Sequence, residues 1–273
     1  MGFAKYHEDI VSRYVNDNRD KGYDYVAIGV EANKPKTEKK RKAKKEKSMA
    51  LKQFAVQKAR PLPVIILADT SGSMSVDGKI DVLNSSIKDM VAAFAEEGRQ
   101  QAEIQLVVVT FGGSQAAMHL PLTPAHEIAD IQPMQASGPT PMGGAFELVA
   151  QLLEDKEKIP SRAYRPALVL LSDGHPTDDW AKGFKTLCDS ERAQKATRFA
   201  MAIGSDADES MLKDFVNDAE APVFKADQAR DIPRFFKAVT MSVTARTRSQ
   251  APNEIPAIDF DAMDDEDELD LDF

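Results

Sequence analysis

The run Pro63-Val64-Ile65-Ile66-Leu67-Ala68-Asp69-Thr70-Ser71-Gly72-Ser73 joins an uninterrupted apolar stretch to a loop rich in oxygen-bearing side chains. A buried strand of a parallel sheet reads as a short continuous apolar run, and 64–68 fits this pattern, with a turn signal at Gly72. Open α/β sheets bind their ligands at the carboxyl ends of such strands. The loop that follows this strand is therefore a candidate site.

Asp69, Ser71 and Ser73 place one carboxylate and two hydroxyls within five residues. Gly72 lets the loop curl, so that the alternate side chains converge. All three donors are hard oxygen atoms, which suit Mg²⁺ or Mn²⁺, whereas zinc prefers histidine or cysteine. The pattern predicts a site for a hard divalent cation.

Two distant segments extend this prediction. Residues 137–144, Ser-Gly-Pro-Thr-Pro-Met-Gly-Gly, precede an apolar helical pattern, so Thr140 is expected in a rigid loop that enters a helix. Residues 167–174, Ala-Leu-Val-Leu-Leu-Ser-Asp-Gly, form a second apolar strand that ends in Asp173. Three such loops together argue against the simpler interpretation of Asp-x-Ser-x-Ser as an ordinary helix-capping turn.

In these three loops the chain resembles the von Willebrand factor A (VWA) domain family over about residues 61–246. The metal-ion-dependent adhesion site of that family consists of Asp-x-Ser-x-Ser, a threonine on a second loop and an aspartate on a third. In the family the two serines bind the ion directly, the threonine does so when ligand is engaged, and the aspartates commonly act through water. The implied metal-binding residues are Asp69, Ser71, Ser73, Thr140 and Asp173.

The amino-acid sequences of the three loops are similar to those of bacterial TerY-type VWA proteins, which are named for tellurite-resistance gene clusters. The matching segments are Asp-Thr-Ser-Gly-Ser-Met (69–74), Gly-Pro-Thr-Pro-Met-Gly-Gly-Ala (138–145) and Leu-Leu-Ser-Asp-Gly-His-Pro-Thr-Asp-Asp-Trp (170–180). This resemblance implies a stress or phage-defence setting with a Ser/Thr kinase and a PP2C-type phosphatase as partners. Other bacterial VWA proteins work beside MoxR-type AAA+ ATPases, and no residue selects between the two associations.

Alternating apolar strands and amphipathic helices predict an α/β fold with a doubly wound, mostly parallel sheet flanked by helices, as in VWA and Rossmann-like domains. One short strand at 115–121 is expected at an antiparallel edge, as in the family. We expect strands at 62–68, 103–111, 115–121, 166–172, 197–204 and 222–225, and helices at 79–97, 143–155, 178–194, 208–217 and 230–245.

The hypothesis for function is a non-enzymatic, metal-dependent adaptor. Two carboxylates leave a divalent cation with residual positive charge, and octahedral Mg²⁺ keeps waters that an incoming oxygen can replace. We therefore expect an Asp or Glu of a protein partner to complete the coordination. Met74 and His175 are assigned to the partner-binding rim.

A Mg²⁺-dependent enzyme is the alternative of another class. His175, which follows Asp173, is the best candidate for an acid or base, since imidazole titrates near neutrality. No glycine-rich loop followed by Lys-Ser or Lys-Thr is present, so the sequence offers no phosphate cradle of the P-loop kind. Asp178 and Asp179 are expected to start the helix at 178–194. We assign no catalytic residue.

The charge of the chain is segregated, and four regions are expected. These are a small N-terminal appendage (1–30), a basic linker (31–60), the VWA domain (61–246) and an acidic disordered tail (247–273). The linker holds ten lysines and two arginines against three glutamates. The lysine-rich run from Lys34 to Lys47 lacks interleaved aromatic residues and the pI of the chain is near 5.1, so we do not expect a nucleic-acid partner, although basic tracts do bind phosphates.

The last twenty residues hold ten acids and no base. Apolar residues alternate with these acids, which suits docking onto a partner. The tail is alternatively an autoinhibitory placeholder, because its carboxylates are tethered ligands for the metal site at an effective concentration of about a millimolar. The candidate docking residues are Phe260, Leu269, Leu271 and Phe273.

Composition limits the classes further. A hydrophobic fraction of 42% with 29% charged residues is ordinary for a globular protein. The single cysteine, Cys188, excludes an internal disulfide framework and is expected in the core. No apolar stretch is long enough to span a bilayer, and the N-terminus does not resemble a signal peptide. We therefore expect a cytoplasmic bacterial protein without a membrane partner.

Overall fold

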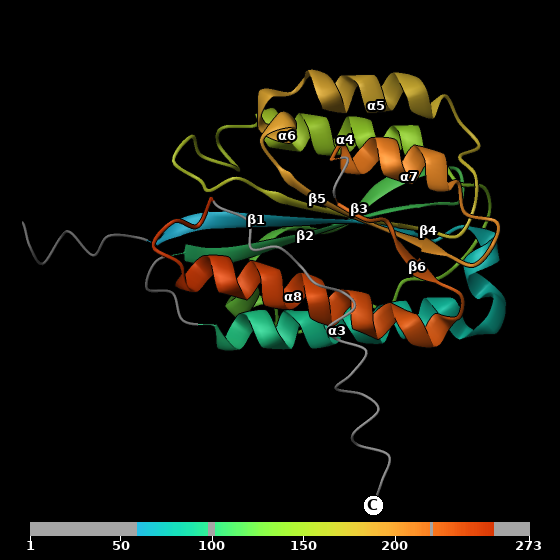
Figure 1. Cartoon of the computed structure of the whole chain (residues 1–273), viewed down its shortest axis with the longest axis horizontal. Coiled ribbons are helices and arrows are strands. Elements are labelled where there is room, and N and C mark those ends of the chain that lie inside the picture. Colours follow the sequence, from blue (N-terminus) through green and yellow to red (C-terminus); the bar gives the residue numbers. More distant parts are fainter. Residues whose placement is uncertain (1–58, 98–101, 219–220, 254–273) are drawn as a thin grey trace, which may run out of the picture. The chain divides into compact units, whose positions relative to one another are not determined.

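The computed structural model describes residues 59–97, 102–218 and 221–253 (Figure 1). All of the described residues belong to one compact unit, which begins at Ala59. The expectations for the appendage (1–30), for nearly all of the basic linker and for the tail from residue 254 lie outside the described residues.

Six strands form one sheet in the order β3-β2-β1-β4-β5-β6. All neighbouring strands run parallel except β3, which pairs antiparallel with β2 at the edge. The doubly wound, mostly parallel sheet and its antiparallel edge strand are thus confirmed. The strands are β1 (Arg60–Asp69), β2 (Ala102–Gly112), β3 (Gln115–Pro124), β4 (Ala167–Ser172), β5 (Thr197–Ile203) and β6 (Phe224–Ala226).

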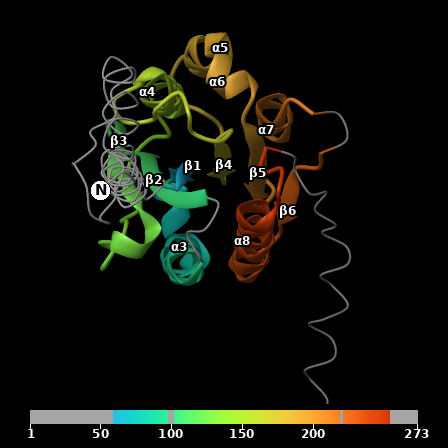
Figure 2. The same ribbon diagram turned by 90° about the vertical axis from the view of Figure 1, so that its left-hand side faces the viewer.

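Helices cover both faces of this sheet. In Figures 1 and 2, α3 (Lys79–Glu96) and α8 (Ile232–Arg248) lie on one face. The other face carries α4 (Met142–Glu154), α5 (Trp180–Asp189), α6 (Glu191–Gln194) and α7 (Glu209–Val216). Short 3₁₀ helices form at Gly72–Gly78 (η2), Ala125–Glu127 (η3) and Ala229–Asp231 (η4).

One expected helix is divided. The sequence predicted a continuous helix over 178–194, whereas α5 ends at Asp189 and α6 begins at Glu191. The residue between them, Ser190, adopts an extended conformation, and its hydroxyl accepts a hydrogen bond from the N–H of Ala193. The same hydroxyl donates to Glu154 at the end of α4. A serine cap therefore interrupts the helix, because such side chains compete with helical backbone bonds.

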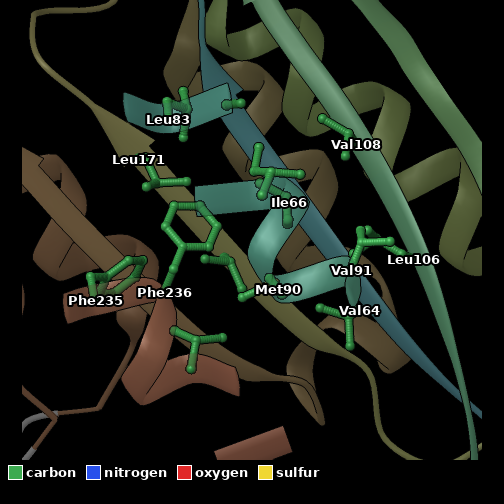
Figure 3. Packing of buried hydrophobic residues seen from close by; sticks show 14 of the residues in the cluster. Val64, Ile66, Leu83, Met90, Val91, Leu106, Val108, Leu171, Phe235 and Phe236 are labelled. Carbon is green, nitrogen blue, oxygen red and sulfur yellow. The ribbon is translucent and has the colours of Figure 1, made fainter. Parts of the chain in front are cut away.

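The side chains of β1 contribute to two hydrophobic clusters, one on each face of the sheet. Its side chains alternate between the two faces with a period of two, as a strand requires. Val64 and Ile66 belong to the cluster under α3 and α8, while Ile65 and Leu67 belong to the cluster under the other helices. Figure 3 shows the first cluster, in which Phe236 of α8 packs near Met90 of α3. Burial on both faces explains the continuous apolar run of the strand.

The described chain continues past α8 and is tied back to the loop before β4. The buried guanidinium of Arg246 donates to the carbonyls of Arg165 and Pro252, and the side chain of Asn253 accepts the N–H of Arg165. Burial lowers the pKa of Arg246 to about 10. In the described part of the chain, no helix combines the length and apolarity that crossing a bilayer demands.

Candidate metal centre

Asp69 is the last residue of β1 and is fully buried. Its two carboxylate oxygens accept hydrogen bonds from the N–H of Ser71 (2.8 Å) and the hydroxyl of Ser172 (2.6 Å). Burial, which disfavours the charged form, raises the pKa of Asp69, while these hydrogen bonds oppose the increase. Asp69 is thus a desolvated carboxylate for which a cation would be a favourable neighbour.

The two serines and Asp173 form a continuous chain of oxygen atoms. The hydroxyls of Ser71 and Ser73 are 3.0 Å apart, and Ser73 donates to Asp173 Oδ1 at 2.6 Å. Asp173 directly follows β4, which pairs with β1, so adjacent parallel strands bring together residues one hundred positions apart. Ser73 is exposed, whereas Ser71 and Asp173 are buried. The cluster therefore meets solvent at Ser73.

Backbone hydrogen bonds place the loop that carries Thr140 beside the Asp-x-Ser-x-Ser loop. The N–H of Ser137 donates to the carbonyl of Thr70 (2.8 Å), and the N–H of Gly72 donates to the carbonyl of Gly138 (2.9 Å). Gly138 has φ +68°, and a Cβ there would lie 2.7 Å from Gly113 Cα. Only glycine fits this left-handed, crowded position. Thr140 itself is buried.

Of the two residues that fix this loop, the sequence did not point to Thr177, and it predicted another role for Asp178, at the start of the helix at 178–194. Thr177 accepts the N–H of Thr140 on its hydroxyl (2.9 Å) and donates its own N–H to the carbonyl of Thr140 (3.0 Å). Asp178 accepts the N–H groups of Gly143 (2.9 Å) and Gly144 (3.0 Å) in the first turn of α4. Asp178 therefore caps α4, whereas Asp179 caps α5 through the N–H of Lys182, as expected.

A lysine also reaches the cluster. The Nζ atom of Lys79, the first residue of α3, lies 2.8 Å from Asp173 Oδ2. The side chain of Lys79 is 17% exposed and that of Asp173 is 0% exposed. The two residues are 94 positions apart, and no local sequence pattern linked them.

The two residues assigned to the rim have different positions. Met74 is fully buried in the core cluster under α3, so the expectation that it lies on the partner-binding rim is wrong. An apolar side chain in the short helix η2 gains more from the core than from the surface. His175 is exposed, and its Nδ1 lies 3.3 Å from Asp208 Oδ2. The candidate tail residues Phe260, Leu269, Leu271 and Phe273 lie outside the described part of the chain.

The donors suit a hard divalent cation. Mg²⁺ binds oxygen at about 2.0–2.1 Å in an octahedron, which separates adjacent ligands by about 2.9–3.0 Å. The 3.0 Å between the hydroxyls of Ser71 and Ser73 matches this spacing. Over the described residues, no three His, Cys, Asp or Glu side chains gather as a metal-binding group. The hydroxyl groups would therefore supply part of the coordination.

The sheet order and the oxygen-lined strand ends define an α/β domain with a candidate cation site. The model of the von Willebrand factor type A domain matches residues 64–238, well over half of the chain. The chain therefore belongs to the VWA family, whose members are generally interaction modules. No curated protein matches the chain.

Solved structures share the fold. Proximal thread matrix protein 1 from the mussel byssus is 18% identical with a TM-score of 0.54, over 68% of this chain and 48% of that one. The structure of the same protein with a zinc-occupied MIDAS (metal-ion-dependent adhesion site) motif is 17% identical with a TM-score of 0.52, over 68% of this chain and 48% of that one. A von Willebrand factor type A protein from Catenulispora acidiphila is 20% identical with a TM-score of 0.50, over 67% of this chain and 42% of that one. The matched region spans less than half of each of these chains, and such identities show the fold alone.

Proposed function

We propose that this protein binds a carboxylate of another protein through a divalent cation held by Asp69, Ser71, Ser73, Thr140 and Asp173. The observation that carries the proposal is the hydrogen-bonded chain Ser71, Ser73 and Asp173, which ends at the solvent-exposed Ser73. The zinc in the MIDAS motif of the byssus protein shows that a VWA domain holds a divalent cation there. For this chain we propose Mg²⁺ or Mn²⁺, because all of the donors are hard oxygen atoms.

Each side chain has a role in this proposal. Ser71 and Ser73 bind the ion directly, and Ser73 can still donate its proton to Asp173. Asp69 and Asp173 would supply negative charge for the cation and act on it through hydrogen bonds with intervening water. Thr140 joins when the partner is engaged. The bound ion supplies a Lewis-acidic position for one carboxylate oxygen of the partner.

His175 supports binding better than catalysis. Its imidazole is exposed and pairs with Asp208, which also caps α7 by accepting the N–H of Met211. A general base must lie within hydrogen-bonding distance of the substrate proton that it removes, and here that proton would lie beside the oxygen cluster. The partner of His175 instead lies beyond β5, so we keep His175 as a rim residue and assign no catalytic residue.

The setting is a finer proposal. The wording of the three loops resembles the TerY-type subgroup, which supports an adaptor in a bacterial stress or defence system with a kinase and a phosphatase as partners. An accessory subunit of a MoxR-type AAA+ ATPase is the second candidate. The family model and the solved structures distinguish no subgroup, so the proposal of this setting is supported only by the sequence similarity of the three loops.

The first experiment is a titration of Mn²⁺ into the full chain by calorimetry, with Asp69→Asn as the test variant. Asparagine keeps the shape of the buried side chain, and its amide can still accept the Ser71 N–H and donate to the Ser172 hydroxyl. We expect binding by the wild type and its loss in the variant. Asp130→Asn is the matched control, because Asp130 is exposed and pairs only loosely, at 3.7 Å, with Lys88.

The second experiment captures partners from the source cytoplasm on the same three proteins, each with Mg²⁺ and with EDTA. A partner retained by the wild type and by Asp130→Asn in Mg²⁺, and lost both in EDTA and in Asp69→Asn, supports the proposal. Capture that is indifferent to EDTA and to Asp69→Asn contradicts it and assigns binding to another surface.

A further inference from the structure

Lys79 puts a positive charge into the candidate metal centre. Its Nζ atom lies 2.8 Å from Asp173 Oδ2, while Ser73 holds the other oxygen of the same carboxylate at 2.6 Å. A Cβ built on Gly204, just after β5, would lie 3.9 Å from the same Nζ atom. The ammonium therefore sits at the carboxyl ends of β4 and β5, beside the proposed ligands.

The local structure directs this lysine to the site. Asp77 and Gly78 both have positive φ angles, 55° and 69°, and this tight turn starts α3 at Lys79. The first turn of a helix favours negative groups, because the N-terminal end of the helix dipole is positive. A lysine there is unfavourable for the helix by itself. Its contact with the buried carboxylate of Asp173 offsets this cost.

A cation that uses the second carboxylate must share Asp173 with Lys79. Two carboxylates and one ammonium leave the donor set with one net negative charge, which attracts a divalent ion less than two unpaired carboxylates would. Once a divalent ion is bound, the same groups carry one net positive charge. A partner carboxylate neutralises that charge.

We infer that Lys79 weakens cation binding in the absence of a partner and strengthens carboxylate binding to the loaded site, so that the cation and the acidic partner bind cooperatively. The inference rests on the proposed function and names a regulatory element of the same site. Because coupling is reciprocal, a carboxylate ligand must raise the affinity for the cation by the same factor that the cation raises the affinity for the carboxylate.

The competing explanation is purely structural, in which Lys79 only anchors α3 to the end of β4. In that case Lys79→Met lowers the free energy of unfolding and leaves the affinity for Mn²⁺ unchanged. The test therefore measures both quantities on each protein: urea unfolding in EDTA, and Mn²⁺ binding by calorimetry.

We expect Lys79→Met to bind Mn²⁺ about tenfold more tightly than the wild type, because a like charge beside the ion is removed. Lys79→Arg keeps the charge and should stay near the wild type. Lys88→Met is the matched control, since Lys88 lies on the same helix, is half exposed and contacts Asp130. Equal Mn²⁺ affinity in Lys79→Met and the wild type would overturn the inference and leave the proposed function standing.

Lys79→Gln is the second neutral variant if Lys79→Met does not fold, and a measurement in acetate tests the coupling in whichever variant folds. Mn²⁺ is titrated in sodium acetate and in sodium chloride of equal ionic strength, with correction for manganese acetate formed in solution. We expect tighter Mn²⁺ binding in acetate, and a smaller gain in Lys79→Met where that variant folds. Identical affinities in both salts overturn the coupling. Absence of Mn²⁺ binding in every protein and salt contradicts the proposed function itself.

Discussion

Thr140 and Thr177 are joined by two hydrogen bonds that run in opposite directions. The N–H of Thr140 reaches the hydroxyl of Thr177, and the N–H of Thr177 reaches the carbonyl of Thr140. The pair fastens the loop before α4 to the loop after β4. The two hydrogen bonds thus fix the loops that carry Thr140 and Asp173 relative to each other, although these loops are far apart in the sequence.

The variant Thr177→Val tests this frame. Valine keeps the shape and the N–H but removes the hydroxyl, so the buried N–H of Thr140 loses its acceptor. Because Thr140 joins the ion only when a carboxylate is engaged, we expect Mn²⁺ affinity measured in acetate to fall about tenfold, as is usual when a residue that orients a metal ligand is lost, and Mn²⁺ affinity in chloride to change less. Calorimetry provides the measurement. Thr186→Val is the control, because the Thr186 hydroxyl bonds only within α5; a similar loss in both variants would argue against a specific role.

Asp69→Asn separates metal binding from stability. Burial raises the pKa of Asp69, so in EDTA the protonated side chain stabilises the folded state. This stabilisation is complete at pH values below the ordinary aspartate pKa, and it is lost as the pH rises through the raised pKa. Asparagine carries no charge to desolvate. We therefore expect the variant to be at least as stable as the wild type at pH 7 in EDTA, with an advantage that shrinks in acid. Urea unfolding at pH 7 and pH 4 checks this, and a variant less stable at pH 7 would contradict it.

Excess Mg²⁺ should reverse this order. A ligand that binds only the folded state stabilises it in proportion to the logarithm of its concentration above the dissociation constant. The midpoint of unfolding should rise with Mg²⁺ in the wild type and stay constant in Asp69→Asn. A rise of equal size in both proteins would place the ion elsewhere.

Gly183 and Gly143 allow α5 to approach the start of α4. A Cβ on Gly183 would lie 2.2 Å from the carbonyl oxygen of Gly143, so Gly183→Ala forces the two helices apart. We expect a loss of about 1–3 kcal/mol in the free energy of unfolding, the usual range for overpacking. Gly174→Ala is the control, since nothing lies within 4 Å of its added Cβ. Equal stabilities of the two variants would show that the helices adjust freely.

Glu97 joins the end of α3 to the end of α8. Its carboxylate accepts hydrogen bonds from Arg248 and Thr247, which lower the pKa of Glu97. The stabilisation is therefore present above the ordinary glutamate range and is lost as the pH falls through the lowered value. Glu97→Gln should cost about 1 kcal/mol at pH 7, because Arg248 is largely exposed and the pair is partly screened.

Chemical unfolding of Glu97→Gln and the wild type at pH 7 and pH 3 provides the measurement, and the difference should vanish in acid. Glu191→Gln is the control, because Glu191 and Lys195 form an exposed pair on the surface of α6. That variant should show no measurable change. A pH-independent difference for Glu97→Gln would mean that the charge of Glu97 is unimportant.

The elements of this fold could be read from the sequence because each depends on local pattern. The run at 64–68 is apolar on both faces of β1, and β1 lies in the middle of a parallel sheet. The division of the helix at Ser190 could not be read in this way. A serine inside a helical pattern does not by itself end a helix, and the Ser190 hydroxyl that caps α6 also donates to Glu154, which lies in another helix.

The candidate site was predictable for a geometric reason. Parallel strands end at one edge of the sheet, so Asp69 and Asp173 had to lie near each other once both strands were recognised. The hydrogen bond from Ser73 to Asp173 agrees with that reasoning. The expectation for Met74 failed, because the direction of a side chain in a short 3₁₀ helix depends on the space that the core offers.

By itself, the sequence determined the order of strands and helices, the α/β class and the oxygen donors at the strand ends, because hydrophobic periodicity and the chemistry of loop residues are local properties. Only the tertiary structure decided which side chains hold those donors in place. Lys79 on Asp173 and Asp178 on the first turn of α4 are contacts across long separations in sequence. Such contacts form because packing brings particular charges and hydrogen-bonding groups together, and no local pattern records them.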